Sequence, residues 1–273
     1  MVRIISLFII LLFASAALAA PPSSRLATRL RRRREGRQAH FMHATDRTTK
    51  ASSGSTNGTY HTSTQYSTNW AGALFDTYPS DSFNSVTGTF TVPTPQAASG
   101  ETEGAAAAWV GIDGNTCTTA ILQTGVDFTV INGVVSYDAW YEWYPDLSYD
   151  FEDISISAGD SVTITVTATS TTAGTAEIIN QTTGQTVSKS LTSSYPLCEQ
   201  NAEWIVEDYV ENTSLVPFAN FGAVTFTGAS AGLVAGGTVE PSTADTISLE
   251  EDGTEITSVL IAANSVTITY TGS

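Results

Sequence analysis

The sequence predicts an all-β protein, built as an antiparallel two-sheet β-sandwich of the concanavalin-like or jelly-roll type. Residues 161–169 and 265–270 alternate apolar with hydroxyl side chains, the period-two pattern of a strand with one buried face. Turn-forming residues, as at 132–133, 158–160 and 183–184, separate many short segments of this kind. No helical periodicity extends beyond two turns. Many short strands with turns between them are typical of sandwiches and jelly rolls.

The chain begins with a pattern typical of a secretory signal peptide. Arg3 precedes an apolar run over residues 4–13, and small residues follow up to Ala19. The apolar run is too short to span a bilayer comfortably, and no later stretch is long or apolar enough to do so. We therefore expect residues 1–19 to be a signal peptide and the protein to be secreted and extracellular, with no membrane attachment after the signal is removed.

A basic segment comes next and precedes a long acidic region. Residues 20–50 carry a net charge of +7, and residues 51–68 are rich in Ser, Thr and Gly, which is typical of a linker. A basic run can be a disordered arm or a nucleic-acid-binding patch, but beside an acidic domain in a secreted chain a propeptide explains it better. We expect residues 20–60 to be a propeptide and linker that binds the acidic domain, and residues 61–273 to form the β-sandwich domain.

The acidic region excludes most catalytic devices. Residues 51–273 hold 25 of the 27 acidic residues and one basic residue, Lys189, so their formal net charge is −24. Because no histidine follows His61, residues 62–273 lack a Ser–His or Cys–His pair and the usual zinc ligand. Apart from Lys189, the region has none of the arginines and lysines that nucleic-acid binding requires. A carboxylate base suits work at low pH, since about 0.1% of a histidine is neutral at pH 3.5 while roughly a seventh of a glutamate is ionised.

Two features of the acidic region depend on a secretory route. Cys117 and Cys198 are its two cysteines, and in an oxidising compartment one disulfide is the natural expectation. Closing a loop of about 80 residues contributes about 4.5 kcal/mol in the chain-entropy model. Three N-x-Ser/Thr sequons provide candidate glycosylation sites at Asn57, Asn180 and Asn212.

Four segments combine strand character with acidic, amide and aromatic side chains. Alternate residues of a strand face the same side, so each segment presents these groups together on one face. The aligned residues are Trp109 with Asp113, Gln123 with Asp127, Trp140 with Glu142 and Tyr144, and Glu203 with Glu207. Together they predict a concave sheet face lined with carboxylates, an amide and indoles.

The same segments contain six sequence strings in a fixed order. They are NWAGA at 69–73, AWVGIDG, TAILQTGVDF, YDAWYEWYP, GQTVSKSL and NAEWIVED, and they extend over most of residues 66–273. This set resembles the glutamic peptidases, or eqolisins, which are acid endopeptidases secreted by filamentous fungi. The resemblance implies a sandwich of two antiparallel sheets, the catalytic residues Gln123 and Glu207, and a disulfide between Cys117 and Cys198. It also implies that six residues line or support the substrate cleft: Trp109, Asp113, Asp127, Trp140, Glu142 and Tyr144.

The chemistry of two of these residues is consistent with peptide hydrolysis. An ionised Glu207 can take a proton from a water molecule and return it to the departing nitrogen. The side-chain N–H groups of Gln123 can stabilise a tetrahedral oxyanion at any pH. We therefore expect a monomeric acid endopeptidase that acts on protein and peptide substrates, with no cofactor, no metal and no nucleic-acid partner.

Other classes of protein share parts of this pattern. A pepsin-like aspartic protease needs two Asp-Thr/Ser-Gly copies, whereas this chain has a Thr-Gly after Gln123 and no second copy. A jelly-roll glycoside hydrolase could use Glu142 and Glu207 as its carboxylate pair, and a lectin could bind sugars in the same aromatic groove. Among single residues, Asp113 could serve only to shape a turn, and Glu203 and Glu207 could be ordinary solvated carboxylates.

Overall fold

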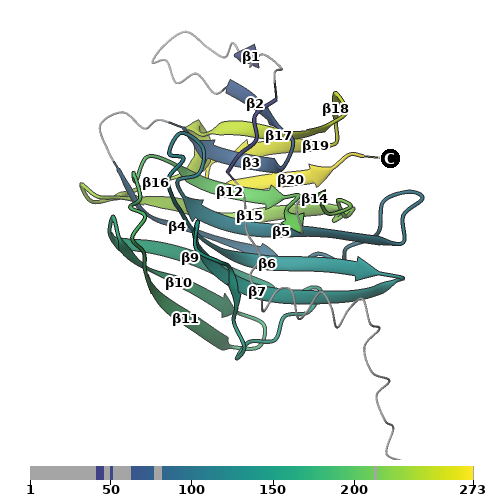
Figure 1. Ribbon diagram of the computed structural model, residues 1–273, viewed down its shortest axis with the longest axis horizontal. Coiled ribbons are helices and arrows are strands. Elements are labelled where there is room, and N and C mark those ends of the chain that lie inside the picture. The colour runs from purple at the N-terminus through teal and green to yellow at the C-terminus, as the bar shows by residue number, and fades with distance from the viewer. Residues whose placement is uncertain (1–40, 46–49, 52–62, 77–81, 212–213, 273) are drawn as a thin grey trace, which may run out of the picture.

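The structure is a computed structural model that describes residues 41–45, 50–51, 63–76, 82–211 and 214–272 (Figure 1). The expected signal peptide and most of the expected propeptide lie outside these residues, as do the sequons at Asn57 and Asn212. Within the described ranges, no helix has the length and apolar character needed to cross a membrane.

Two β-sheets account for nearly all of the regular structure. The larger, ten-stranded sheet contains, in spatial order, β1 (Lys50–Ala51), β2 (Ser63–Ser67), β17 (Asp245–Glu251), β3 (Trp70–Phe75), β12 (Ala202–Glu207), β5 (Glu103–Ile112), β6 (Ile121–Ile131), β7 (Val134–Tyr144) and β8 (Tyr149–Asp150), with β18 (Thr254–Glu255) beside β17. The smaller, eight-stranded sheet contains β11 (Gln185–Thr192), β10 (Ala173–Asn180), β9 (Ser161–Ser170), β4 (Phe83–Thr91), β15 (Ala223–Leu233), β20 (Ser265–Tyr270) and β19 (Thr257–Ala262), with β16 (Thr238–Val239) beside β15. Neighbouring strands are antiparallel, except that β2 and β17 are parallel. A short pair, β13 (Val210–Glu211) with β14 (Ser214–Leu215), and a 3-10 turn at Pro241–Thr243 complete the described elements.

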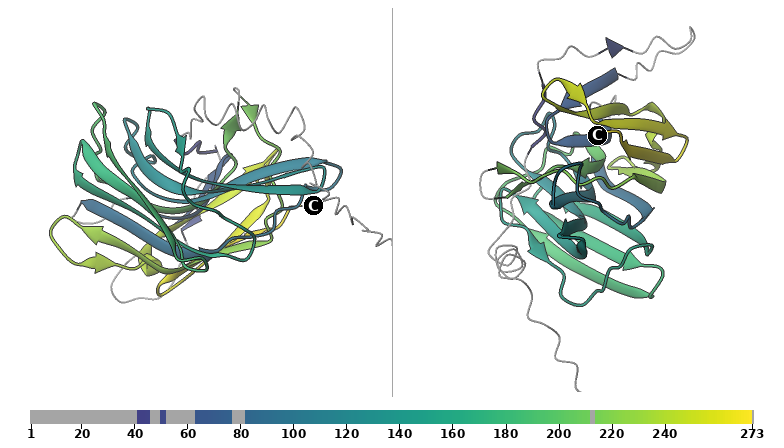
Figure 2. Two further views of the ribbon diagram at one scale, coloured as in Figure 1. Left: turned by 90° about the horizontal axis from the view of Figure 1, so that it is seen from below. Right: turned by 90° about the vertical axis from the view of Figure 1, so that its right-hand side faces the viewer.

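The two sheets pack face to face as curved layers (Figure 2). Alternate residues of β9 and β10 are buried, as period-two patterning requires. Between the layers lie large apolar side chains such as Phe90, Trp204 and Phe226, together with Trp143. Threonine hydroxyl groups line the opposite face of the smaller sheet, where they form hydrogen-bonded pairs across strands. The predicted antiparallel β-sandwich is confirmed.

The central strands of the larger sheet are buried on both faces. Every residue of β3, β6 and β12 is buried, and so is β5 after Glu103. The inner face packs on the smaller sheet, while the outer face carries a second apolar cluster that includes Trp70, Trp109 and Trp140. We call this outer face, with its cluster, the site face. Because burial on both sides removes the alternation of polar and apolar residues, periodicity alone describes these strands poorly.

The expected disulfide joins Cys117 and Cys198, which are 81 residues apart in the sequence. It ties the loop after β5 to the loop before β12. These two strands are neighbours in the larger sheet, so the crosslink holds together the ends of two strands that carry candidate site residues.

Asn180 does not fit its expected role as a glycosylation site. Its side chain is fully buried, and its amide nitrogen donates hydrogen bonds to the Ser155 carbonyl oxygen and to Asp160 Oδ2, at 2.9 and 2.8 Å. Its Oδ1 accepts the backbone N–H of Thr182 at 3.0 Å. A glycan on this nitrogen would break the turn that Asn180 organises, so the burial of Asn180 argues against a glycan at this sequon.

Candidate active site

The strand register brings most of the candidate residues together on the site face. One row across four neighbouring strands consists of Glu203, Gly111, Gln123 and Glu142. The next row on the same face consists of Ile205, Trp109, Gly125 and Trp140, and the third of Glu207, Ala107, Asp127 and Asp138. The face therefore has carboxylates on both sides of an aromatic strip and an amide on one side.

Aromatic packing builds the floor of this site. The rings of Trp70 and Trp109 meet edge to face, with centroids 4.9 Å apart and an interplanar angle of 77°. Gly125 pairs with Trp109 in the register, and a Cβ atom at Gly125 would overlap the Trp109 side chain. The absence of a side chain at Gly125 therefore lets β6 lie close to the Trp109 Cβ and the Ala108 carbonyl oxygen, and the absence of one at Gly111 leaves room for the Trp109 indole ring.

Glu207 is positioned by that indole. Trp109 Nε1 donates a hydrogen bond to Glu207 Oε2 at 3.0 Å, and both side chains are fully buried. Next in the chain, Asp208 has a carboxyl group whose pKa is raised to about 9 by burial and by the Glu207 and Glu251 carboxylates. Asp208 therefore keeps its proton at acid and neutral pH and adds no second negative charge beside Glu207.

Gln123 is held in place from the other side. Its Nε2 donates to Glu142 Oε2 at 3.1 Å, which fixes the orientation of the amide. Its Oε1 is buried and accepts no hydrogen bond from any residue that the structure describes. An amide held in this way keeps one N–H and its carbonyl oxygen available to a bound molecule.

Two further residues belong on this face but were absent from the sequence-based set. Asp138 pairs with Asp127 in the register, and the parity that selected Trp140 would also have selected it. Trp70 lies in the NWAGA string and pairs with Glu207. Both could have been found from signals already present in the sequence.

Asp113 lies at the end of β5 and organises a loop. It adopts a φ of 72°, and its carboxylate accepts the backbone N–H groups of four consecutive residues, 198–201, at 2.8–3.3 Å. Burial raises the pKa of Asp113, and these backbone hydrogen bonds oppose the increase. Asp113 thus supports the site by fixing the loop before β12. This role agrees with the alternative, raised from the sequence, that Asp113 serves to shape a turn.

Glu203 is a buried acid and not a solvated one. Its side chain has no exposed area, and neither carboxylate oxygen has a hydrogen-bond partner within the described part of the chain. Burial raises its pKa well above the ordinary value, and the Asp113 and Asp76 carboxylates add to the increase. Glu203 is therefore protonated at the pH where a carboxylate base works.

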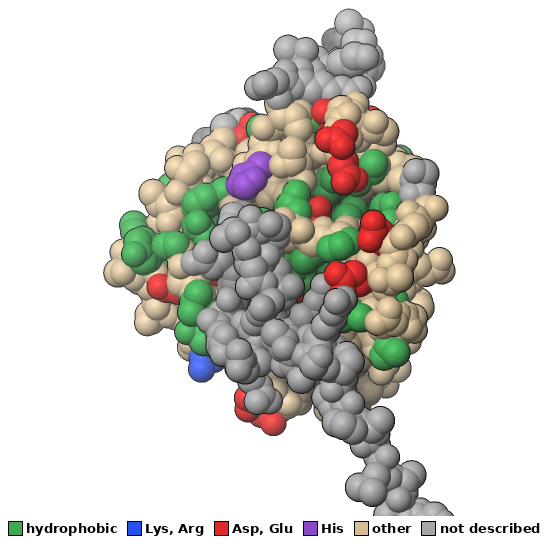
Figure 3. All heavy atoms as spheres, turned by 45° about the vertical axis from the view of Figure 1, so that its right-hand side comes forward, with side chains coloured by type: hydrophobic (Ala, Val, Ile, Leu, Met, Phe, Trp, Pro, Cys, Tyr) green, Lys and Arg blue, Asp and Glu red, His purple; other side chains and the backbone are tan. Residues whose placement is uncertain are grey.

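We expect these buried acids to make the fold more stable at pH 4 than at pH 8. A carboxyl group whose pKa is higher in the folded than in the unfolded state stabilises the fold fully below its unfolded pKa, and this contribution is lost as the pH rises toward the folded pKa. For Asp208 this contribution is lost between pH 3.8, the ordinary pKa, and about pH 9, the pKa in the folded protein. The charged side chains on the face shown in Figure 3 are mostly acidic, and their repulsion at neutral pH acts in the same direction.

Thermal unfolding followed by circular dichroism between pH 4 and pH 8 measures this effect. In Asp208→Asn, the melting temperature should fall less between pH 4 and pH 8 than it does in the parent protein. In Asp252→Asn, at an exposed turn, the fall should be the same as in the parent. A melting temperature that rises steadily from pH 4 to pH 8 would contradict the conclusion that these buried carboxyl groups keep their protons in the folded protein.

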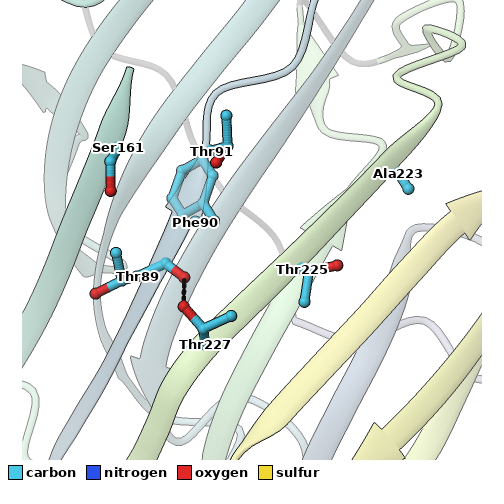
Figure 4. Close-up of a pocket in the computed structure, with 7 residues that line it drawn as sticks. All are labelled: Thr89, Phe90, Thr91, Ser161, Ala223, Thr225 and Thr227. Carbon is cyan, nitrogen blue, oxygen red and sulfur yellow. Dashed lines mark hydrogen bonds between the residues drawn. The ribbon is translucent and has the colours of Figure 1, made fainter. Parts of the chain in front are cut away.

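Two other clusters in the described part of the chain are poor candidates for the catalytic centre. Asp113, Cys117 and Cys198 have metal-like spacing, but both sulfur atoms are in the disulfide and are not thiolates. A cavity of about 240 Å³ on the smaller sheet is lined by hydroxyl and apolar groups and has no titratable side chain (Figure 4). Its lining residues are Thr89, Phe90, Thr91, Ser161, Ala223, Thr225 and Thr227.

A β-sandwich with a buried glutamate and a fixed glutamine on one aromatic face defines a hydrolase of the carboxylate–amide type. Residues 68–270 match the sequence profile of the Peptidase A4 family. The chain is 47% identical to Aspergillopepsin-2 of Aspergillus niger in an alignment that covers 95% of this chain and 96% of that protein. It is also 47% identical to Scytalidopepsin B of Scytalidium lignicola in an alignment that covers 73% of this chain and 72% of that protein.

Solved structures give the same result. A crystal structure of scytalido-glutamic peptidase with a transition state analog inhibitor superposes with a TM-score of 0.68 at 43% identity, covering 74% of this chain and 98% of that one. Aspergilloglutamic peptidase from Aspergillus niger superposes with a TM-score of 0.59 at 56% identity, covering 61% and 99%. The chain belongs to the Peptidase A4 family, that of the glutamic peptidases. It is a glutamic-type endopeptidase, and the glycoside hydrolase and lectin alternatives are not supported.

Proposed function

We propose that this endopeptidase is secreted, works outside the cell at acid pH, and uses Glu207 and Gln123 as its catalytic pair. The observation that carries the assignment is the indole–carboxylate hydrogen bond of 3.0 Å between Trp109 and Glu207, on the same buried face as Gln123. Glu142 holds the Gln123 amide at 3.1 Å, so both members of the pair are oriented before substrate binds.

The reaction needs a base, an oxyanion donor and an acid. Glu207 takes a proton from a water molecule, whose oxygen attacks the scissile carbonyl carbon. The N–H of Gln123 that is not bound to Glu142 donates to the oxyanion of the tetrahedral intermediate, while its carbonyl oxygen helps to hold the water. The protonated Glu207 then gives its proton to the leaving nitrogen as the carbon–nitrogen bond breaks. A neutral amide keeps its N–H donors at any pH, which suits catalysis in acid.

The positioning residues fit the proposed roles. The Trp109 indole can only donate, so it holds a carboxylate oxygen whether or not Glu207 carries a proton on its other oxygen. Asp208 is neutral at acid and neutral pH, which favours placing the local negative charge on Glu207.

The basic N-terminal segment is proposed to be a propeptide that binds this domain. Its described end, residues 41–45, contacts the site face: Phe41 and Met42 pack against the aromatic cluster. Charge complementarity supports the same role, because residues 20–50 carry +7 and residues 51–273 carry −24. In acid, protonation of carboxylates weakens this attraction and so favours release.

One experiment tests the proposed function. The protein recovered from culture medium is analysed by N-terminal sequencing and assayed at pH 3.5 on denatured protein and on polysaccharide, with and without pepstatin. We expect an N-terminus beyond residue 45, proteolysis that resists pepstatin, and no sugar release. Pepstatin-sensitive proteolysis, or an active protein that still carries residues 20–45, would contradict the proposal.

A further inference from the structure

A cavity of about 670 Å³ opens at one end of the sandwich, between the borders of the two sheets. Two residues of β7, the loop at 145–147, Tyr149 of β8 and residues 189–192 of β11 line it. We call it the edge cavity, because β11 is the last strand of the smaller sheet and β8 the last of the larger. β7 and β11 lie at the lower side of Figure 1. The volume is in the range of cavities that hold small molecules or single side chains of a partner.

The edge cavity is separate from the proposed catalytic centre. Trp140, Glu142 and Tyr144 of β7 lie on the site face, where Trp140 and Tyr144 belong to its aromatic cluster. Tyr141 and Trp143 alternate with them and therefore point to the opposite face, where Trp143 joins the core between the sheets. An occupant of the edge cavity thus lies behind β7 and leaves the site face open.

The walls of the edge cavity are aromatic and partly open to solvent. The Tyr141 and Tyr149 rings stack with centroids 5.9 Å apart and an interplanar angle of 26°. Tyr149 is 48% exposed and Leu147 is 37% exposed. Trp143 is buried and fixed, because its Nε1 donates to the Tyr195 carbonyl oxygen at 2.9 Å. Apolar surface that meets water inside a concavity is typical of a binding site.

The edge cavity also contains the single basic side chain of residues 51–273, Lys189. Lys189 pairs with the buried Ala176 in the register, so its side chain points toward the larger sheet. Its Nζ lies 5.8 Å from the centroid of the Tyr141 ring, a cation–π contact. Within the described ranges, Lys189 forms no ion pair with a carboxylate. Although 25 acidic residues surround it in the sequence, this cation is available to a ligand.

The charges decide which class of anion fits. Residues 51–273 carry a net charge of −24, which repels a polyanion such as an acidic polysaccharide but costs much less for one carboxylate. The edge cavity also holds an acceptor, Asp146, whose Oδ2 accepts the Ser193 hydroxyl at 2.9 Å. A carboxylate has lone pairs for a further N–H. The set of groups therefore fits a molecule with one carboxylate, an N–H and an apolar side chain.

The border strand offers backbone groups to such a molecule. Among the described strands, β11 pairs with β10 alone, so every second N–H and C=O of β11 points away from the sheet. A peptide can pair with these groups by strand addition. Neither a fatty acid nor a sugar acid has a backbone that would use them, so the ligand that fits best is a peptide.

We propose that the edge cavity binds the C-terminal residue of a polypeptide. Lys189 holds the terminal carboxylate, Tyr141 and Tyr149 contact an apolar side chain, and the preceding residues extend along β11. An endopeptidase creates a new C-terminus with every bond that it cleaves, so ligands of this class form wherever the enzyme acts. The edge cavity therefore retains cleaved chains beside the enzyme. The inference goes beyond the proposed function and does not depend on which residues form the catalytic pair.

A matched pair of peptides tests the proposal without any variant protein. The protein is titrated at pH 5 with acetyl-Gly-Gly-Phe and with the C-terminal amide of the same peptide, and nitrogen-15 NMR gives Kd for each. At this pH the terminal carboxylate is ionised, since its ordinary pKa is about 3.3–3.7. We expect the free acid to bind about tenfold more tightly than the amide, and its addition to shift the resonances of residues 189–192 and the Trp143 indole. Replacing the final Phe by Gly should weaken binding about tenfold.

Variants of β11 show whether Lys189 is the partner of the carboxylate. Lys189→Gln should abolish the difference between acid and amide, whereas Lys189→Arg should keep it. Ser188→Ala is the matched control, because Ser188 is exposed on the opposite face of β11 and should bind both peptides as the parent does.

Three results would overturn the proposal. The first is equal binding of the acid and the amide. The second is a preference for the acid that survives in Lys189→Gln, or shifts confined to the site face. The third is tighter binding of galacturonate than of acetyl-Gly-Gly-Phe, which would make the edge cavity a site for sugar acids.

Discussion

Replacement of Glu207 by glutamine is expected to lower kcat at pH 4 on the order of 10⁴-fold, the upper range for loss of a general base and acid. The amide has nearly the shape of the carboxyl group and can still accept the Trp109 indole N–H, which is 3.0 Å from Glu207 Oε2. It cannot take a proton from water or return one to the leaving nitrogen. The melting temperature should therefore stay close to that of the unmodified protein while turnover is lost.

The matched control for this variant is Glu177→Gln. Glu177 lies on β10 of the smaller sheet, remote from the site face, and the change removes the same charge. We expect Glu177→Gln to keep its kcat within about twofold, since surface changes of this kind have small effects. If Glu207→Gln retained turnover within tenfold of the parent, another group would have to be the base.

Replacement of Gln123 by alanine should lower kcat by about 10²- to 10³-fold, the usual effect of removing one oxyanion donor. KM should change little, because the lost hydrogen bond forms mainly in the transition state. The substitution also removes the donor to Glu142 Oε2, so a loss of about 1–3 kcal/mol in stability is expected. Steady-state kinetics and thermal unfolding separate the two effects.

Two further variants isolate the role of the Gln123 amide. Gln181→Ala, at an exposed turn of the smaller sheet, should have unchanged kinetics. Gln123→Glu should regain part of the lost activity at pH 3, where a protonated carboxyl group donates an O–H, and lose it again as the pH rises toward 6. A Gln123→Ala enzyme with unchanged kcat, or a Gln123→Glu enzyme whose activity rises with pH, would argue against oxyanion stabilisation by this residue.

How far the sequence could predict the fold depended on how each strand is buried. Residues 161–169 have one solvated face, so their alternation identified a strand directly. The strands that carry the site are buried on both faces, and their polar residues were recognised through motif and parity. Parity placed Gln123 and Glu207 on the site face because a strand geometry fixes which residues point together.

Other features of the site depend on packing between distant segments. The sequon at Asn180 is a local signal, whereas the burial of that amide arises from its contact with Asp160, 20 residues away. The raised pKa of Asp208 requires the charges and burial that neighbouring elements impose on it. The hydrogen bonds of Asn69, inside the NWAGA string, to Phe41 and His43 likewise join residues 28 and 26 positions apart in the sequence.

The measurement that tests the catalytic pair most directly is kcat/KM at pH 4 for Glu207→Gln, Gln123→Ala and the double variant. Residues that act in one step are not additive, so the account predicts that the double variant loses only slightly more than Glu207→Gln alone. Losses that multiply fully, or a Glu207→Gln enzyme close to the parent, would contradict the claim that these two side chains work as one unit.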